Sequence, residues 1–220
     1  MRQETITYNI YKFSELNLEA QKTAIDKARE DASNMVYEFN LPDQSREIER
    51  ALESLGFNDA RVLYDCSYSQ GSGACIEFKS FDVHELTRKA LKESYIPHGI
   101  ASALSRLIDI LKPIKAYKGD YHFNAWTSVN SFGTHYCHEK TRYINIEYEN
   151  YSERESTRDK YDSLIYPDIE NEFTSVIQDI GGVIHESLCA GIEYYWNDSA
   201  VIEWVNNSDC EFDESGDVYN

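Results

Sequence analysis

The chain has 220 residues, a formal net charge of −18 and 41% apolar residues. This length and apolar content are typical of a folded protein with one or two domains and argue against a disordered chain. The charge argues against direct binding of DNA, RNA or an anionic membrane, because like charges repel.

Apolar residues that recur every three or four positions predict helices in the first half of the chain. We expect these helices over residues 18–39, 43–55, 82–94 and 97–113. Asn17 is placed to cap the first helix, and Pro42 is expected to separate it from the second.

Alternating polar and apolar residues predict strands. We expect strands over residues 5–10, 61–69, 74–80, 115–131 and 142–151. The turn Gln70-Gly71-Ser72-Gly73 joins the second and third strands as a hairpin, because its glycines permit positive φ angles. Cys66 and Cys75 are expected to face each other across this hairpin.

The C-terminal third is predicted to be helical after an exposed loop over residues 152–160. Helices are expected over residues 162–179 and 183–195, separated by Gly181-Gly182, and a short one runs from Asp198 to Val205. Helices and strands come in runs, so we predict an α+β fold: a largely antiparallel sheet with helices packed on it. We find no linker or repeat and expect one domain over residues 1–220, with an acidic helical subregion over residues 161–220.

The negative charge is concentrated near the C-terminus. Residues 1–150 carry 22 acidic and 18 basic residues, whereas residues 151–220 carry 17 acidic and three basic ones, and no Lys or Arg follows Lys160. A solubilising surface normally mixes both signs. The segment therefore predicts a partner with a basic surface.

Neither a secretion signal nor a membrane span is expected. Residues 1–12 alternate like a strand, and no window reaches the roughly 20 apolar residues that a bilayer requires. Five irregularly spaced cysteines are typical of reduced cytosolic thiols. We therefore expect a cytoplasmic protein.

One short run is rich in metal-ligating side chains, His135-Tyr136-Cys137-His138. Zinc prefers such ligands, but a further ligand must come from His185, Cys189 or Cys210. His185 and Cys189 are four residues apart and share one helix face. The alternative is a loop whose His and Cys residues are incidental, and we predict no metal and no cofactor.

No nucleophile motif is present, so we expect a protein without enzymatic activity and name no catalytic residue. The hairpin turn offers backbone N–H groups and short polar side chains to a small ligand. Its candidate ligand-binding residues are Tyr68, Ser69, Gln70, Gly71, Ser72 and Gly73. The alternative is a plain hairpin turn.

Acidic residues follow the predicted C-terminal helices. The candidate partner-binding residues are Asp162, Asp168, Glu170, Glu172, Asp179, Glu186 and Glu193. Carboxylates three or four positions apart on a helix lie roughly 5–6 Å from one another, comparable to neighbouring phosphates. Such a face can mimic nucleic acid, and the alternative is a solvated helix surface.

Three segments resemble a family of uncharacterised phage and prophage proteins that are loosely labelled antitoxins. These segments are Tyr8–Ile25, Ser67–Ala74 and Glu193–Asp198 with Glu211–Gly216. Ser72 stands where the family usually has Asp, which weakens any carboxylate role for the turn.

The resemblance implies action inside a bacterial host cell. We therefore expect an accessory protein that inhibits a host defence system, of the anti-CRISPR or anti-restriction kind, by binding a basic surface that normally holds nucleic acid. One alternative is a module that binds or sequesters a nucleotide-like signal at the hairpin. Another is an antitoxin-like partner of a basic toxin.

Overall fold

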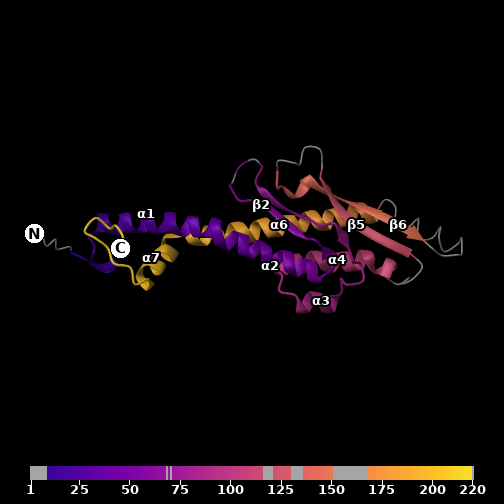
Figure 1. The fold of residues 1–220 in the computed structure, drawn as a ribbon, viewed down its shortest axis with the longest axis horizontal. Coiled ribbons are helices and arrows are strands. Elements are labelled where there is room, and N and C mark those ends of the chain that lie inside the picture. The colour runs from indigo at the N-terminus through magenta and orange to yellow at the C-terminus, as the bar shows by residue number, and fades with distance from the viewer. Residues whose placement is uncertain are drawn as a thin grey trace, which may run out of the picture. The chain divides into compact units, whose positions relative to one another are not determined.

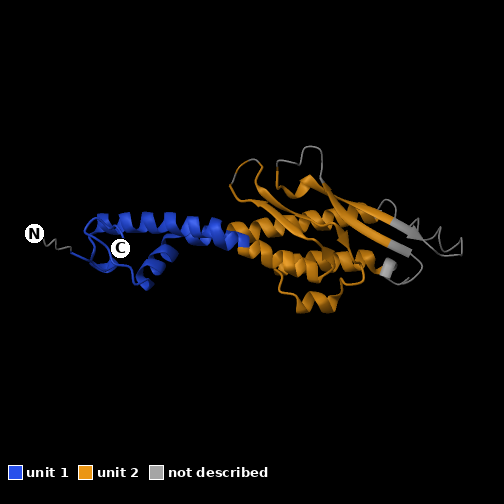
Figure 2. Ribbon diagram, viewed as in Figure 1, with its two compact units in different colours: residues 1–42, 190–220 blue, residues 43–189 orange. Residues whose placement is uncertain are grey.

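The computed structural model describes residues 9–67, 69, 71–115, 121–129, 136–150 and 168–219. Figure 1 shows the helices and strands in chain order, and Figure 2 shows the two compact units into which the chain divides. Unit 1 comprises residues 1–42 and 190–220, and unit 2 comprises residues 43–189. Compact units can still fold as one cooperative domain, so the prediction of a single domain stays a prediction.

The predicted α+β class is confirmed, since helices accompany antiparallel strand pairs. Strand β1 (Phe57–Asn58) pairs with β4 (Ser80–Phe81), and β2 (Arg61–Asp65) pairs with β3 (Gly73–Glu77). The longest pair joins β5 (Tyr121–Val129) to β6 (Arg142–Asn150). The predicted hairpin and the two later strands are therefore confirmed within the described residues.

Unit 2 is organised around helix α6 (Asp168–Trp196), which continues into unit 1 from Ala190. Its Phe173 ring lies 5.3 Å from the Phe81 ring and 6.4 Å from the Phe78 ring, measured between centroids. Helix α4 (His98–Lys115) packs on α6 where Gly99 approaches Val183. Helices α2 (Leu41–Ser54) and α3 (Arg88–Glu93) complete the unit.

The predicted break at Gly181-Gly182 is wrong, because α6 is continuous through both glycines. A Cβ atom on Gly181 would lie 2.5 Å from the carbonyl oxygen of Ala74 and 2.9 Å from Cβ of Glu139. The missing side chain therefore allows β3 to approach the helix backbone. Gly182 has no atom within 4 Å of such a position.

Unit 1 is built from both ends of the chain. Helix α1 (Leu18–Met35) is capped as predicted, since the Asn17 side chain accepts hydrogen bonds from the backbone N–H groups of Glu19 and Ala20. The buried alanines of α1 contact helix α7 (Asp198–Asn207) through Val201 and Val205. A short 3-10 helix, η1 (Phe13–Glu15), precedes α1.

The predicted break at Pro42 is also wrong. A π-helical turn, η2 (Val36–Asn40), joins α1 to α2, and the N–H of Leu41 donates to the carbonyl of Val36. Pro42 then lies in the first turn of α2, directly after this π-helical turn.

Two local predictions are wrong, one on the hairpin and one on the start of helix α3. Cys75 pairs with Leu63 in the β2–β3 ladder, so Cys66 lies beyond the end of β2 and does not face Cys75. Thr87 caps α3, whereas Asp82 accepts a hydrogen bond from His84 in the preceding turn. None of the described helices is long and apolar enough to cross a bilayer.

Candidate functional site

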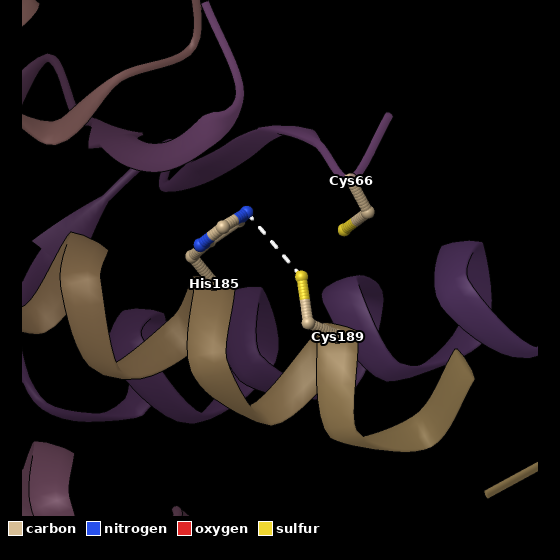
Figure 3. Close-up of side chains that lie close together, drawn as sticks. All are labelled: Cys66, His185 and Cys189. Carbon is tan, nitrogen blue, oxygen red and sulfur yellow. Dashed lines mark hydrogen bonds between the residues drawn. The ribbon is translucent and has the colours of Figure 1, made fainter. Parts of the chain in front are cut away.

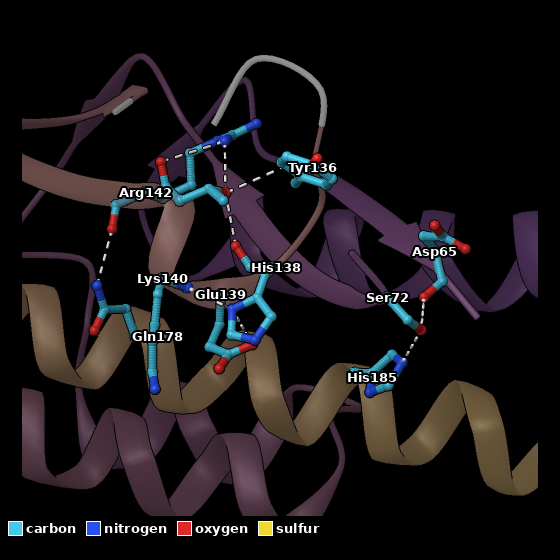
Figure 4. A network of polar contacts seen from close by, with 10 residues as sticks. Asp65, Ser72, Tyr136, His138, Glu139, Lys140, Arg142, Gln178 and His185 are labelled. Atoms are coloured by element: carbon cyan, nitrogen blue, oxygen red, sulfur yellow. Dashed lines mark hydrogen bonds and ion pairs between the residues drawn. The ribbon is translucent and has the colours of Figure 1, made fainter. Parts of the chain in front are cut away.

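The hairpin loop and helix α6 meet through Ser72. The Ser72 hydroxyl donates to the carbonyl oxygen of Asp65 at 2.6 Å, and its Oγ lies 3.2 Å from Nε2 of His185 (Figure 4). The Asp65 carboxylate in turn accepts from the backbone N–H of Ser67, and its hydrogen bonds from Ser67 hold the pKa of Asp65 below its usual value. These contacts fix the loop to the helix.

The glycines of the loop serve close packing. Gly71 and Gly73 are outside the positive-φ positions of the described residues, contrary to the expected role. A Cβ on Gly71 would lie 2.3 Å from the Tyr136 ring, and one on Gly73 would lie 2.8 Å from Cα of His138. Residues 136–138 therefore cover the hairpin.

The predicted ligand-binding residues are brought together only in part. Ser69 lies in the loop and accepts from Ser67, and Ser72 is held by its two internal contacts. Tyr68 and Gln70 lie outside the described residues. Ligand binding at this turn stays a prediction.

Three metal-ligating side chains converge beside Ser72. The ligand atoms of Cys66, His185 and Cys189 all lie within 4.8 Å of one another, and Sγ of Cys189 is 3.3 Å from Nε2 of His185 (Figure 3). Both thiols are buried, whereas His185 is half-buried. Burial, followed by the nearby Cys189, raises the pKa of Cys66 to about 12.

This cluster differs from the predicted run of ligands at residues 135–138. His135 lies outside the described residues, and Nδ1 of His138 faces the Glu139 carboxylate at 3.1 Å. The predicted pairing of His185 with Cys189 on one helix face is confirmed. Cys66 was missed because it lies far from both in the chain, and no spacing signals its approach.

An ion pair between a buried arginine and a half-buried glutamate links strands β6 and β3. Arg142, only 4% exposed, begins β6, and its guanidinium contacts the Glu77 carboxylate of β3 at 2.8 and 2.9 Å. The backbone carbonyl of Arg142 accepts from the Gln178 side chain of α6 (Figure 4). The pair thus joins two strands to the helix that carries His185.

The predicted partner-binding acids occupy one helix and a preceding segment. Glu172, Asp179 and Glu186 are exposed on α6, where seven residues span about 10 Å. Asp179 forms an ion pair with Arg106 at 2.7 Å, and Glu170 is half-buried. Of the others, Asp162 lies outside the described residues, Asp168 begins α6, and Glu193 lies in the part of α6 that belongs to unit 1.

Some acids of the C-terminal segment have basic partners within unit 1. Asp217 pairs with Lys27 and Asp198 pairs with Arg29. Glu211 lies 3.8 Å from Lys12. The N-terminal segment therefore supplies part of the basic complement that the sequence predicted for another molecule.

A second feature is an apolar groove of about 380 Å³ in unit 1, which we call the aromatic groove. Its lining includes Met35, Asn40, Tyr194, Tyr195, Glu203 and Trp204. Met35, Tyr194 and Trp204 remain 51%, 62% and 44% exposed, and the Asn40 side chain donates to the Tyr195 hydroxyl at 3.3 Å. These residues were not predicted, because three separate segments contribute them.

Fold and sites together define a mixed α+β protein with one thiol-imidazole cluster and one aromatic groove in its described part. The family model described as "Domain of unknown function (DUF8835)" matches residues 41–198, so the chain belongs to this family. The match carries no phage or antitoxin description, and that part of the resemblance stays a prediction. Comparisons with curated proteins and with solved structures found no match.

Proposed function

We propose that this protein acts without catalysis, by binding a basic surface of another protein through unit 1. The observation that carries the proposal is the aromatic groove, which leaves Trp204 and Tyr194 exposed beside the carboxylate of Glu203. Large exposed apolar side chains in a groove are typical of protein–protein interaction sites.

Charge favours a cationic partner for this groove. Unit 1 carries 15 acidic and five basic residues, and residues 190–220 contain eight acids and no base. Lys and Arg side chains are attracted both by carboxylates and by the faces of Trp and Tyr rings. A partner that presents a basic side chain to the groove would use both interactions.

We extend the proposal to the class of partner. In the phage setting that the sequence motifs imply, the partner is a host defence protein whose basic surface normally holds nucleic acid, and the negative field of unit 1 speeds the encounter. A basic toxin could bind the same groove. Capture of a toxin in the experiment below would support the antitoxin alternative instead.

Site-specific photo-crosslinking tests the groove directly. The chain carries a benzoylphenylalanine at position 204 or, as a control, at Tyr95 in unit 2, which is 88% exposed. In lysate of the bacterial host, position 204 should capture one basic protein that position 95 does not. Capture should fall as salt rises through the physiological range, since the attraction is screened.

Charge reversal separates the groove from the acidic row on α6. Glu203→Lys should lower the crosslinking yield at position 204 by about tenfold or more, because like charges would then face each other. Glu172→Lys makes the same change on α6 and should leave the yield unaltered. Identical capture at both crosslinker positions, or loss only with Glu172→Lys, would contradict the assignment to the groove.

A further inference from the structure

We propose that Cys66, His185 and Cys189 form a binding site for one zinc ion, a site independent of the aromatic groove. The ligands come from two elements, the loop after β2 and helix α6, both within unit 2. All three ligand atoms lie within 4.8 Å of one another, which places them around one point (Figure 3).

The distances fit zinc coordination. Zinc takes tetrahedral ligands, with Zn–S bonds of about 2.3 Å and Zn–N bonds of about 2.0–2.1 Å. Such a tetrahedron separates its ligand atoms by about 3.5–3.8 Å. The Cys189 to His185 distance is 3.3 Å, and the remaining pairs need a contraction of no more than about 1.3 Å, within reach of side-chain rotation.

The donor set also fits. Thiolate and imidazole are the ligands that zinc prefers, and two Cys with one His is a set that leaves the fourth position to water. His185 is half-buried while both thiols are buried, so one side of the triangle is nearer to solvent.

The surroundings hold the ligands in place. The Oγ of Ser72 lies 3.2 Å from Nε2 of His185, the nitrogen that also faces Cys189, so zinc bound to this nitrogen would displace the Ser72 contact. The close approach of Gly181 to Ala74 brings the hairpin onto α6 one turn before His185. Burial raises the pKa of the Cys66 thiol, and each cysteine would release its thiol proton to solvent when it coordinates the ion.

Cobalt(II) is the probe for this site because it replaces zinc and reports its ligands. The full-length protein, purified with reductant and freed of metal, should bind one equivalent of cobalt. Binding should produce a thiolate-to-cobalt charge-transfer band together with the visible bands of a tetrahedral ion. One equivalent of zinc should abolish both.

Ligand variants locate the ion. Cys66→Ser, Cys189→Ser and His185→Gln should each weaken zinc binding by about 100-fold or more, because each removes one ligand atom. Cys137→Ser is the matched control, since Cys137 is half-buried and outside the triangle. Ser72→Cys should strengthen the charge-transfer band by adding a third thiolate. Circular dichroism of each metal-free variant separates loss of a ligand from loss of fold.

Several results would overturn the site. Reduced wild-type protein without a charge-transfer band would do so, whatever the variants show. Equal loss of binding in a folded Cys137→Ser variant would place the metal elsewhere. Uptake of copper(I) without zinc or cobalt would overturn the assignment to zinc, and a Cys66–Cys189 disulfide that reductant leaves intact would exclude the metal.

Discussion

The two units bury different kinds of side chain. Unit 2 packs large residues, with Phe57, Phe81 and Phe173 among its fully or nearly fully buried rings. Unit 1 packs the alanines of α1 against Val201, Val205 and Phe212. The free energy of burial scales with apolar area, so unit 2 has the larger hydrophobic stabilisation.

The exposed aromatics show the opposite distribution. Unit 1 leaves Tyr194, Trp196 and Trp204 at least 44% exposed, and its two ends are joined by exposed ion pairs. The DUF8835 match covers all of unit 2 but only part of unit 1. Unit 2 is therefore the part of the chain that the family model covers in full, and it contains the thiol-imidazole cluster, whereas unit 1 exposes several of its large side chains at the surface.

The largest expected effect lies in the core of unit 2. Phe173→Ala should lower the free energy of unfolding by about 4 kcal/mol, because it removes a fully buried ring and leaves a cavity. Val205→Ala, which removes only two methyl groups from the core of unit 1, should cost about 2 kcal/mol. Urea denaturation followed by circular dichroism measures both losses, and a loss at Val205 as large as that at Phe173 would contradict the expected order.

Two adjacent glycines of α6 test how closely strand β3 packs against this helix in unit 2. Gly181→Ala should destabilise the protein by about 2 kcal/mol, since its Cβ would strike the Ala74 carbonyl. Gly182→Ala, with open space around it, should stabilise the helix by about 0.5–1 kcal/mol. Thermal melts of the two variants give opposite shifts if helix–strand contact is the reason for Gly181. Melting temperatures that shift in the same direction would contradict this reason for Gly181.

The smallest effect is expected at the ion pairs of unit 1. Lys27→Ala and Arg29→Ala should each cost less than about 1 kcal/mol, because exposed pairs gain little in water. The loss should shrink further in 1 M salt. Melts at low and high salt test this, and a large salt-independent loss would mean that these side chains stabilise unit 1 by packing instead.

Local patterns predicted much of the fold. The Asn17 cap, the apolar stripe of α4 and the alternation of β5 and β6 were all readable, because neighbouring residues decide them. Pro42 and Gly181 were misread as breaks. Each is tolerated for a reason outside its own segment: a π-helical turn precedes Pro42, and β3 packs against Gly181.

The sites were less predictable than the fold. Helical spacing placed His185 beside Cys189, but only the docking of the β2–β3 hairpin on α6 brought Cys66 to them. The aromatic groove likewise needs α1, α6 and α7 together. Side chains from distant segments converge through packing, which no periodicity within one segment encodes.

The sequence by itself determined the charge of −18 and the absence of Lys and Arg after Lys160. Composition fixes these, whatever the fold. Only the tertiary structure decided which of these acidic residues form ion pairs within the chain. Lys12, Lys27 and Arg29 contact acidic residues near the other end of the chain. Electrostatic attraction acts over distance in space and not along the chain, so part of the expected basic partner is the protein's own first helix and the turn before it.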